Sequence, residues 1–515
     1  MNKHIKTSIS IALAAGFVAF LFGGWAIVVA GGIAGLGLGY YLFGQSKAQK
    51  WQDSIKEALL PTLITAVILL ALSIFQNYYV AAAIGKKPIP FNTMLQANAT
   101  GIGGLIFFSF ALTLMHILPL RWQRIAQIVL LTFVVISFPF IDKFTGLRWT
   151  AQVIFALIFT ILALGLNIVV GFAGLLDLGY AAFFAIGAYT TGILSSPQHG
   201  IFLNFWLVIW IAAGVAGIFG LILGAPTLPL RGDYLAIVTL GFGEIVPVLF
   251  KNLIKVTIQE PFTCWILPLF RIQTSCITFM QDVDLTAGEK GISPIGRPIL
   301  PIIGEFQSNN PIPWYFLIIA IILLSVFLIQ RLRDSRMGRA WMAIREDELA
   351  ASQMGIDPVR TKLLAFAMGA TFSGFAGAFY GAYVRGIFPS VFDFSVSIIV
   401  LCMVILGGLG NINGVIVGGM VIMSADRLFL PALKDFLAGL LKATILPALS
   451  SNPTLRAAVE QNANPILYRF LLFGLTLVIM MAVRPEGLIP SAQRKAELRS
   501  DEEIAADQAA AEAQA

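Results

Sequence analysis

Long apolar runs, separated by short polar or charged connections, make up most of this chain. Most runs are about 17 to 25 residues long, the length that an α-helix needs to cross the hydrocarbon core of a membrane. The pattern predicts an all-α polytopic membrane protein with about 14 transmembrane helices. The predicted spans lie near residues 7–23, 26–43, 58–84, 99–120, 125–141, 149–170, 173–194, 203–223, 234–253, 313–331, 362–385, 392–410, 413–432 and 466–483.

The first two spans leave two interpretations open. The segment Phe22-Gly23-Gly24-Trp25 fits a tight turn between two short helices, and it also fits an irregularity in one long helix, since glycine is common inside membrane helices. The basic start of the chain followed by an apolar run resembles a secretory signal peptide. The run is too long for one, however, and no convincing cleavage site follows, so we expect it to be retained.

Composition and charge agree with a lipid environment. Of 515 residues, 58% are hydrophobic and only 12% are charged, with a mean hydropathy of +0.86. A soluble domain carries about twice that charged fraction. The net charge of +7 is spread over the connections instead of forming a basic face, so it indicates membrane topology and no nucleic-acid partner.

The orientation follows from one connection that is crowded with basic residues, which should be cytoplasmic. Counting spans outward from it puts the N- and C-termini in the cytoplasm and the long segments 254–312 and 433–465 in the periplasm. Cys264 and Cys276 lie in the first of these segments, where a disulfide between them and two free thiols are both open interpretations. The basic residues of the crowded connection are Arg331, Arg333, Arg336, Arg339, Arg345, Arg360 and Lys362.

The chain carries no motif of its own for catalysis. It has no Gly-x-x-x-x-Gly-Lys-Ser/Thr phosphate loop and no Cys/His spacing for a metal, and its histidines are only three and dispersed. We therefore expect no enzyme, no metal and no cofactor in this chain, and any ATP that drives it must be bound by another subunit. A membrane-embedded enzyme is disfavoured for the same reason.

The most specific signal lies in the cytoplasmic connection, residues 332–361, here called the coupling loop. Apolar and charged residues alternate at approximately helical spacing between Arg339 and Ala351, and Gly355 is placed to end a helix. The pattern predicts a short cytoplasmic helix followed by a turn. A short surface helix between two spans is suited to docking on a partner.

Several motifs in the coupling loop and beyond it carry a resemblance to a known family. Ala350-Ala351-x-x-x-Gly355 resembles the Glu-Ala-Ala loop of bacterial ABC import permeases, with Leu349 in the place of the Glu and Glu348 beside it. The order of further motifs is similar to that of LivM-type permeases of branched-chain amino acid importers, over about residues 125–490. These motifs are Ala343-Ile344-Arg345-Glu346-Asp347, Lys362-Leu363-Leu364-Ala365-Phe366, Gly165-Leu166-Asn167-Ile168-Val169-Val170-Gly171, Ala182-Phe183-Phe184-Ala185-Ile186-Gly187, Gly407-Gly408-Leu409-Gly410-Asn411 and Arg484-Pro485-Glu486-Gly487-Leu488.

The resemblance implies a multi-pass permease of the bacterial inner membrane that moves branched-chain or related hydrophobic amino acids. It implies a second homologous permease subunit, two cytoplasmic ATP-binding subunits that hold ATP and magnesium, and a periplasmic substrate-binding protein. It also implies a domain organisation, with a permease core of about ten helices after about four N-terminal helices. The expected parts are an N-terminal hydrophobic extension (1–122), the core (123–490) with its periplasmic loop (254–312) and coupling loop (332–361), and a polar tail (491–515).

Candidate functional residues fall into two sets. The path candidates Asn167, Gly171, Asp177 and Glu244 lie in or between apolar spans, where a carboxylate costs a few kcal/mol unless it is paired or hydrated. Helix packing for Gly171, capping for Asp177 and structural pairing for Glu244 are the open alternatives. The candidates for contact with the ATPase are Arg345, Glu346, Glu348, Ala350, Ala351 and Gly355.

An ion-coupled secondary amino-acid transporter is the competing hypothesis. Asp177 and Glu244 would then be the coupling sites for protons or sodium. A self-contained carrier would not require a docking-type loop, so the importer is favoured.

Overall fold

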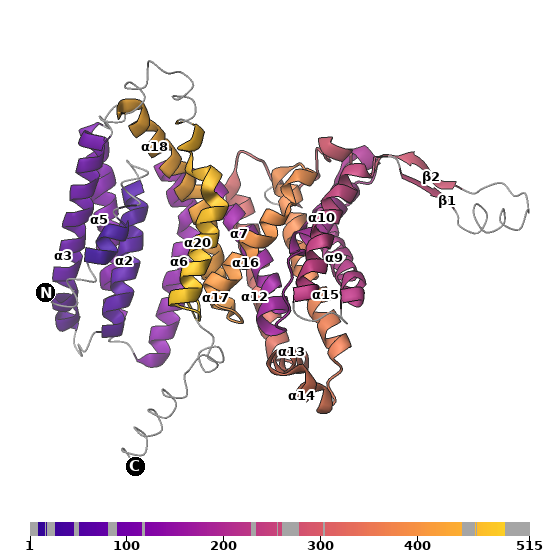
Figure 1. Ribbon diagram of the computed structural model, residues 1–515. Coiled ribbons are helices and arrows are strands. Elements are labelled where there is room, and N and C mark those ends of the chain that lie inside the picture. The colour runs from indigo at the N-terminus through magenta and orange to yellow at the C-terminus, as the bar shows by residue number, and fades with distance from the viewer. Residues whose placement is uncertain are drawn as a thin grey trace, which may run out of the picture. The chain divides into compact units, whose positions relative to one another are not determined.

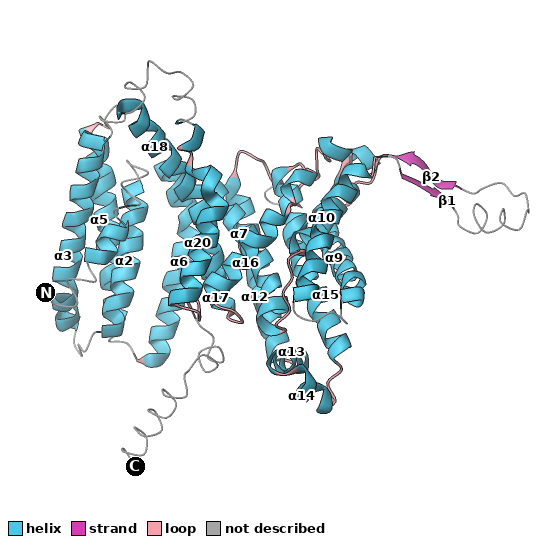
Figure 2. Ribbon diagram, in the orientation of Figure 1, coloured by secondary structure: helices cyan, strands magenta, loops and turns pink. Residues whose placement is uncertain are grey.

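Nearly all of the predicted apolar segments are α-helical in the computed structural model of the chain (Figures 1 and 2). The described part of the chain contains eleven helices that are long and apolar enough to cross a membrane, and two shorter apolar helices, Ala26–Leu42 and Tyr180–Ser195. The prediction of an all-α polytopic membrane protein is confirmed. The structure describes residues 9–15, 17, 26–45, 51–80, 90–115, 119–227, 233–254, 256–259, 278–301, 304–444, 459 and 461–489.

The chain divides into two compact units, each considered by itself. Unit 1 comprises Met1–Gln152 and Ala425–Arg469, and unit 2 comprises Val153–Ser424 and Phe470–Ala515. The turn Phe22–Trp25, on which the first two spans depend, lies outside the described residues.

Unit 1 is built from long helices and two short π-helical turns. Its elements are α2 (Ala26–Gln45), α3 (Trp51–Phe75), the π-helix η1 (Gln76–Val80), α5 (Phe91–Leu114), α6 (Leu120–Thr145), the start of α7 (Thr150–Leu166), the π-helix η8 (Ala425–Phe429), α18 (Leu430–Thr444) and the 3₁₀-helix η9 (Pro465–Tyr468). Helices α2 and α5 approach closely: a Cβ at Gly35 would lie 2.8 Å from the carbonyl oxygen of Leu105. Small residues permit such contacts between membrane helices.

Unit 2 contains most of the long spans. Its helices are the rest of α7, the π-helix η3 (Asn167–Phe172), α8 (Tyr180–Ser195), the 3₁₀-helix η4 (Pro197–His199), α9 (Phe205–Thr227), α10 (Asp233–Asn252), the 3₁₀-helix η6 (Gly288–Lys290), α12 (Pro311–Asp334), α13 (Arg336–Glu346), α14 (Glu348–Gln353), α15 (Pro358–Val384), the 3₁₀-helix η7 (Pro389–Val391), α16 (Phe394–Gly407), α17 (Ile412–Ser424) and α20 (Arg469–Val483, all but its first residue). Helix α15 packs against α8 and α9, and α16 packs against α17.

The core of unit 2 lies around α15. A Cβ at Gly187 of α8 would lie 2.6 Å from Cα of Gly374 of α15, so these two backbones touch. Phe184 and Phe392 lie edge to face at 5.1 Å between ring centroids, beside Tyr380. Close backbone contact and aromatic packing fix α8 against α15.

The predicted span 173–194 is helical only from Tyr180 onward. After α7 and η3 the backbone leaves the helix, and residues 173–179 are non-helical before α8 begins. We call residues 167–179 the membrane break. Since lipid cannot satisfy free backbone groups, such a segment is stable at membrane depth only where protein or a water-filled cavity surrounds it.

Two short antiparallel hairpins lie in the long segment after α10. Strand β1 (Val256–Gln259) pairs with β2 (Thr278–Val283), with register shifts along the pair, and β3 (Ile299–Leu300) pairs with β4 (Gly304–Glu305). Figure 1 shows the β1–β2 hairpin at one end of unit 2 and helices α13 and α14 at the other end. The hairpin and the coupling loop therefore belong to opposite ends of the same unit.

Candidate coupling loop and membrane break

The coupling loop contains two short helices where the sequence predicted one. Helix α13 ends at Glu346, and Asp347 adopts an extended conformation with φ −154°. Its Oδ1 accepts hydrogen bonds from the backbone N–H groups of Leu349 (2.8 Å) and Ala350 (3.0 Å), so it caps α14. Aspartate is a preferred N-cap residue because its carboxylate accepts hydrogen bonds from the free N–H groups at a helix start. The expected single helix is therefore divided at Asp347.

Gly355 ends α14, as predicted. It has a φ of +84°, the left-handed region that favours glycine. Its N–H donates to the carbonyl of Ser352 (3.0 Å), and the N–H of Ile356 donates to the carbonyl of Ala351 (3.2 Å). This pair of bonds is the Schellman arrangement, which satisfies the last carbonyls of a helix.

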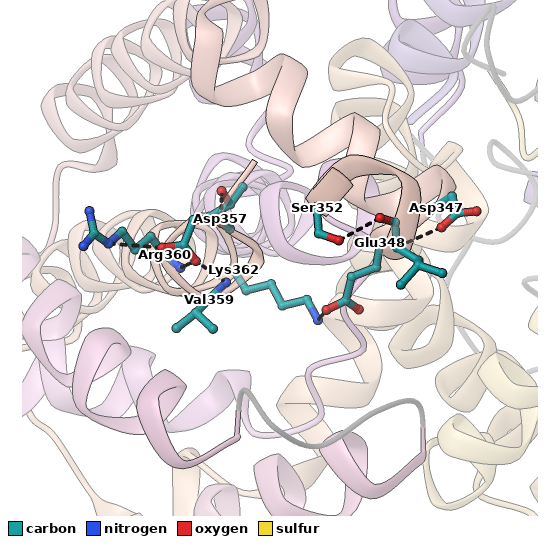
Figure 3. A network of polar contacts seen from close by, with 9 residues as sticks. Asp347, Glu348, Ser352, Asp357, Val359, Arg360 and Lys362 are labelled. Carbon is teal, nitrogen blue, oxygen red and sulfur yellow. Dashed lines mark hydrogen bonds and ion pairs between the residues drawn. The ribbon is translucent and has the colours of Figure 1, made fainter. Parts of the chain in front are cut away.

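Two long-reaching contacts fasten the coupling loop to the start of α15. The indole N–H of the buried Trp341 donates to the carbonyl of Thr361 at 2.8 Å. The Lys362 ammonium, only 8% exposed, lies 2.7 Å from a carboxylate oxygen of Glu348 (Figure 3). Glu348, the acidic residue beside the expected motif position, is therefore engaged within its own chain.

The residues that α14 and its end expose are mainly apolar. Leu349 is 72% exposed and Met354 is 84% exposed. Ala350 and Glu346 are also exposed, whereas Ala351 is buried. An exposed leucine and an exposed methionine on one charged loop are typical of a contact surface.

Arg345 turns inward from α13 to the membrane break. Its Nη1 donates a hydrogen bond of 2.6 Å to the carbonyl of Gly171. A Cβ at Gly174, where φ is +71°, would lie 2.8 Å from Cγ of Arg345, so the arginine stem lies directly on the backbone of the break. A charged donor to a carbonyl makes a stronger hydrogen bond than a neutral donor.

Asn167 and Gly171 join the membrane break to the turn between α16 and α17. Asn167 is buried, and its Oδ1 accepts a hydrogen bond of 3.0 Å from the N–H of Gly410. A Cβ at Gly171 would lie 2.7 Å from that same nitrogen and even closer to Asn167 Oδ1. Only glycine fits there. Arg345, Gly171, Asn167 and Gly410 thus form one connected series of contacts.

Asp177 lies at the end of the break and is buried. Its Oδ1 accepts from the N–H of Gly179 at 2.9 Å, whereas its Oδ2 has no hydrogen-bond partner among the described residues. Asp177 lines a largely apolar pocket of about 380 Å³ together with residues of α8, α9, α10 and α15, among them Phe183, Phe242 and Phe366. Capping of the turn before α8 is thus one function of this side chain.

Glu244 lies apart from the other path candidates. It is exposed on α10 and does not line the pocket. Cys264 and Cys276 lie outside the described residues, so the possible disulfide stays a prediction. In the part of the chain that the structure describes, no group of three or more His, Cys, Asp or Glu residues could hold a metal ion.

Sequence reasoning missed two residues that organise this region. In the sequence, Lys362 is one of several basic residues of the coupling loop, and Gly410 is one of the glycines of a motif. The signal available for Lys362 was its position inside the predicted span 362–385, because a lysine there needs a partner. No local pattern pairs Gly410 with Asn167, which is 243 residues away.

A sequence model of the family described as branched-chain amino acid transport system / permease component matches residues 150–480. The chain belongs to this family. Its resemblance to LivM-type permeases is confirmed as well. The chain is 34% identical over 364 residues to the high-affinity branched-chain amino acid transport system permease protein LivM of Salmonella typhimurium, covering 67% of this chain and 70% of the relative. The identity to LivM of Escherichia coli K12 is also 34%, over 365 residues and the same shares.

A second member of the family is similar over a shorter region. The permease protein LivH of Salmonella typhimurium is 31% identical over 159 residues, 29% of this chain and 50% of that relative. No solved structure matches the chain. Family membership, together with the eleven helices in the described part of the chain that are long and apolar enough to cross a membrane, identifies a multi-pass membrane permease, which is a transport component and not an enzyme.

Proposed function

We propose that this chain is the transmembrane permease subunit of an ATP-binding-cassette importer that moves branched-chain or related hydrophobic amino acids across the inner membrane. The names of its LivM relatives support the substrate class. The largely apolar pocket beside Asp177 suits a hydrophobic cargo. The path candidates remain Asn167, Gly171 and Asp177, with Glu244 on the exposed face of α10.

The observation that carries the proposal is the hydrogen bond from Arg345 to Gly171. It joins a surface-exposed docking helix pair to the π-helical start of the membrane break. A change in binding at one site can act at a second site only through an element that has different contacts in the two states. In this proposal the series Arg345, Gly171, Asn167 and Gly410 is that element, and its observed contacts are those of one of the two states.

The partners follow from this arrangement and from the family. Two cytoplasmic subunits would bind ATP and magnesium, and one of them would contact Leu349 and Met354 of this chain. A homologous second permease would complete the membrane path, and a periplasmic binding protein would deliver the amino acid at the end that carries the β1–β2 hairpin. The N- and C-termini would be cytoplasmic, by the charge of the coupling loop.

In the proposed mechanism, closure of the ATP-binding subunits displaces α13 and α14 as one body. The Trp341–Thr361 and Lys362–Glu348 contacts transmit this displacement to α15, and Arg345 transmits it to the membrane break. The break then exchanges its contacts with Gly410, and the path changes the side on which it is open. In this proposal, this chain opens and closes the path for the amino acid, and the partner subunits hydrolyse ATP.

The test is uptake of labelled leucine into proteoliposomes that contain this chain, the second permease, the ATP-binding subunits and the binding protein. Arg345→Ala should lower the leucine transported per ATP hydrolysed by about tenfold, since the loss of a charged hydrogen bond is worth about 1.5–3 kcal/mol. The matched control is Arg360→Ala. Arg360 is 85% exposed, and among the described residues its side chain pairs with Asp357 alone, so its removal should leave the coupling ratio unchanged.

Two results would contradict the proposal. One is leucine uptake by this chain alone, driven by an imposed proton or sodium gradient, which would favour the ion-coupled carrier with Asp177 or Glu244 as coupling site. The other is an unchanged ratio of leucine transported to ATP hydrolysed in Arg345→Ala. This result would show that the Arg345 contact does not couple the coupling loop to the membrane break.

A further inference from the structure

Glu244 occupies the middle of a membrane span. It follows Asp233 by eleven residues and precedes Asn252 by eight, in a helix of 20 residues. With a rise of 1.5 Å per residue, a helix of this length crosses about 30 Å, the thickness of the hydrocarbon core. Both ends of α10 are thus more than about 10 Å from this carboxylate.

The side chain of Glu244 is exposed, and among the described residues it has neither a hydrogen bond nor an ion pair. Its neighbours on the same face are exposed as well: Ile237 by 63%, Ile245 by 62% and Val248 by 55%. A Cβ at Gly241, on this face, would meet no atom within 4 Å. We call Ile237, Gly241, Glu244, Ile245 and Val248 the α10 face.

Lipid is an unsuitable cover for the α10 face, because a carboxylate in hydrocarbon costs a few kcal/mol and finds no donor there. The exposed face of α12 in the same unit is different. It presents Leu323, Leu324 and Phe327, which lipid can cover at no such cost. The carboxylate therefore distinguishes a face that needs a protein cover from one that does not.

We infer that the α10 face is the contact with the second permease subunit, which supplies a hydrogen-bond donor to Glu244 at mid-span. This inference rests on the proposed function and names the contact through which the two permeases assemble. Gly241 lets a partner helix approach the α10 backbone closely, and a polar pair beside a small residue is how membrane helices associate.

Charge decides between a different subunit and a second copy of this chain. Two copies that packed through the middle of α10 would oppose two carboxylates in a dry contact, which is unfavourable. A different permease can offer a complementary donor. The relatives agree with two distinct subunits, since LivM and LivH of Salmonella typhimurium are both named as permeases of a high-affinity branched-chain amino acid transport system.

The α10 face also borders the pocket that Asp177 lines, because Gly241 and Ile245 line this pocket. A subunit seated on the α10 face would cover that side of the pocket. The inferred contact therefore lies beside the proposed path, where an interface between two permeases would enclose it.

Photo-crosslinking in the reconstituted complex tests the inference directly. A benzoylphenylalanine in place of Ile237 or Val248 should form a covalent adduct with the tagged second permease. The same group in place of Leu323 on α12, which is 64% exposed, is the matched control and should give no such adduct. Adducts of positions 237 and 248 with lipid only, or with a second copy of this chain, would overturn the inference.

Co-purification of the second permease supplies the second readout. Glu244→Gln keeps an acceptor at mid-span and should retain assembly, whereas Glu244→Leu leaves the partner's donor unpaired and should weaken the contact by about tenfold. If equal amounts of the second permease co-purified with Glu244→Leu and with the unchanged chain, the inferred α10 contact would also be refuted. Neither readout requires transport, so a complex that imports leucine but fails both tests would retain the proposed function and lose only the α10 contact.

Discussion

The coupling loop and the membrane break differ in how far their polar groups are satisfied by hydrogen bonds and ion pairs. In the loop, Asp347 caps a helix with two hydrogen bonds and Glu348 pairs with Lys362. In the break, Asn167 and Asp177 each accept one hydrogen bond through Oδ1, whereas Asn167 Nδ2 and Asp177 Oδ2 are buried without a partner among the described residues. A group with a partner holds one geometry, and a buried group without one gains from any new contact. The loop thus behaves as a rigid body, and the break retains the capacity to exchange contacts.

The largest effect should follow from filling the tightest point of the break. Gly171→Ala puts a methyl group against Asn167 and Gly410, and overpacking of this kind costs about 1–3 kcal/mol. A cost of about 1.4 kcal/mol in only one of the two states of the path would shift the equilibrium between them by about tenfold. We therefore expect leucine uptake to fall by about tenfold or more. Leucine uptake by proteoliposomes measures the effect on transport, and the unfolding temperature in detergent measures the effect on stability.

Gly214→Ala in α9 is the matched control for this prediction, because a Cβ there would meet no atom within 4 Å. It should leave uptake and stability unchanged. If Gly171→Ala behaved like Gly214→Ala, the contact of Gly171 with Asn167 and Gly410 would not be tight, and the proposed role of this contact in transport would be excluded.

The next effect concerns the rigidity of the loop and is asymmetric. Glu348→Gln leaves the nearly buried Lys362 ammonium without its counter-charge, whereas Lys362→Met leaves a Glu348 that is 37% exposed and can be hydrated. We expect the first change to cost about 1–3 kcal/mol and the second about 1 kcal/mol or less, below the values for fully buried pairs. Thermal unfolding measures both, and equal losses would show that the lysine is not effectively buried.

A smaller effect is expected at the docking surface. Leu349→Ser removes an exposed apolar side chain, so the permease should fold normally and bind its ATP-binding partner more weakly by about 1–2 kcal/mol. Phe202→Ser is the control, since Phe202 is equally exposed but lies in the connection between α8 and α9. Titration of the ATP-binding subunit onto both variants in nanodiscs measures the two affinities. Equal affinities would exclude Leu349 from the contact.

The smallest effect should come from Asp177→Asn. The asparagine carbonyl keeps the hydrogen bond from the Gly179 N–H, and only the unpartnered oxygen changes. Uptake should stay within about threefold, equivalent to roughly 0.7 kcal/mol. A complete loss of uptake in a variant that still assembles would give the charge of Asp177 a role in transport beyond capping.

The features that sequence predicted well are those with local causes. The spans follow from runs of apolar residues, and the end of α14 follows from Gly355, whose left-handed conformation is a property of glycine. The division of the coupling loop at Asp347 also has a local cause, since aspartate is a strong helix cap, but the helical spacing of apolar and charged residues continues across it.

The features that sequence did not predict join distant segments. Arg345 and Gly171 are 174 residues apart, and no periodicity relates them. The two basic residues Arg345 and Arg360 look alike in a charged loop, yet one bonds to the membrane break and the other lies 85% exposed. Which charge turns inward depends on where α13 lies against η3, and a single sequence does not contain that position.

The exposed Glu244 has a consequence for the biosynthesis of the complex. A chain inserted in the membrane before its partner keeps this carboxylate against lipid, and that costs free energy until another subunit covers it. With the inferred α10 contact, an unassembled subunit would be less stable than an assembled one and would be the better substrate for a membrane protease. Through one carboxylate on α10, a cell would hold the number of permeases of this kind close to the number of partners available to them.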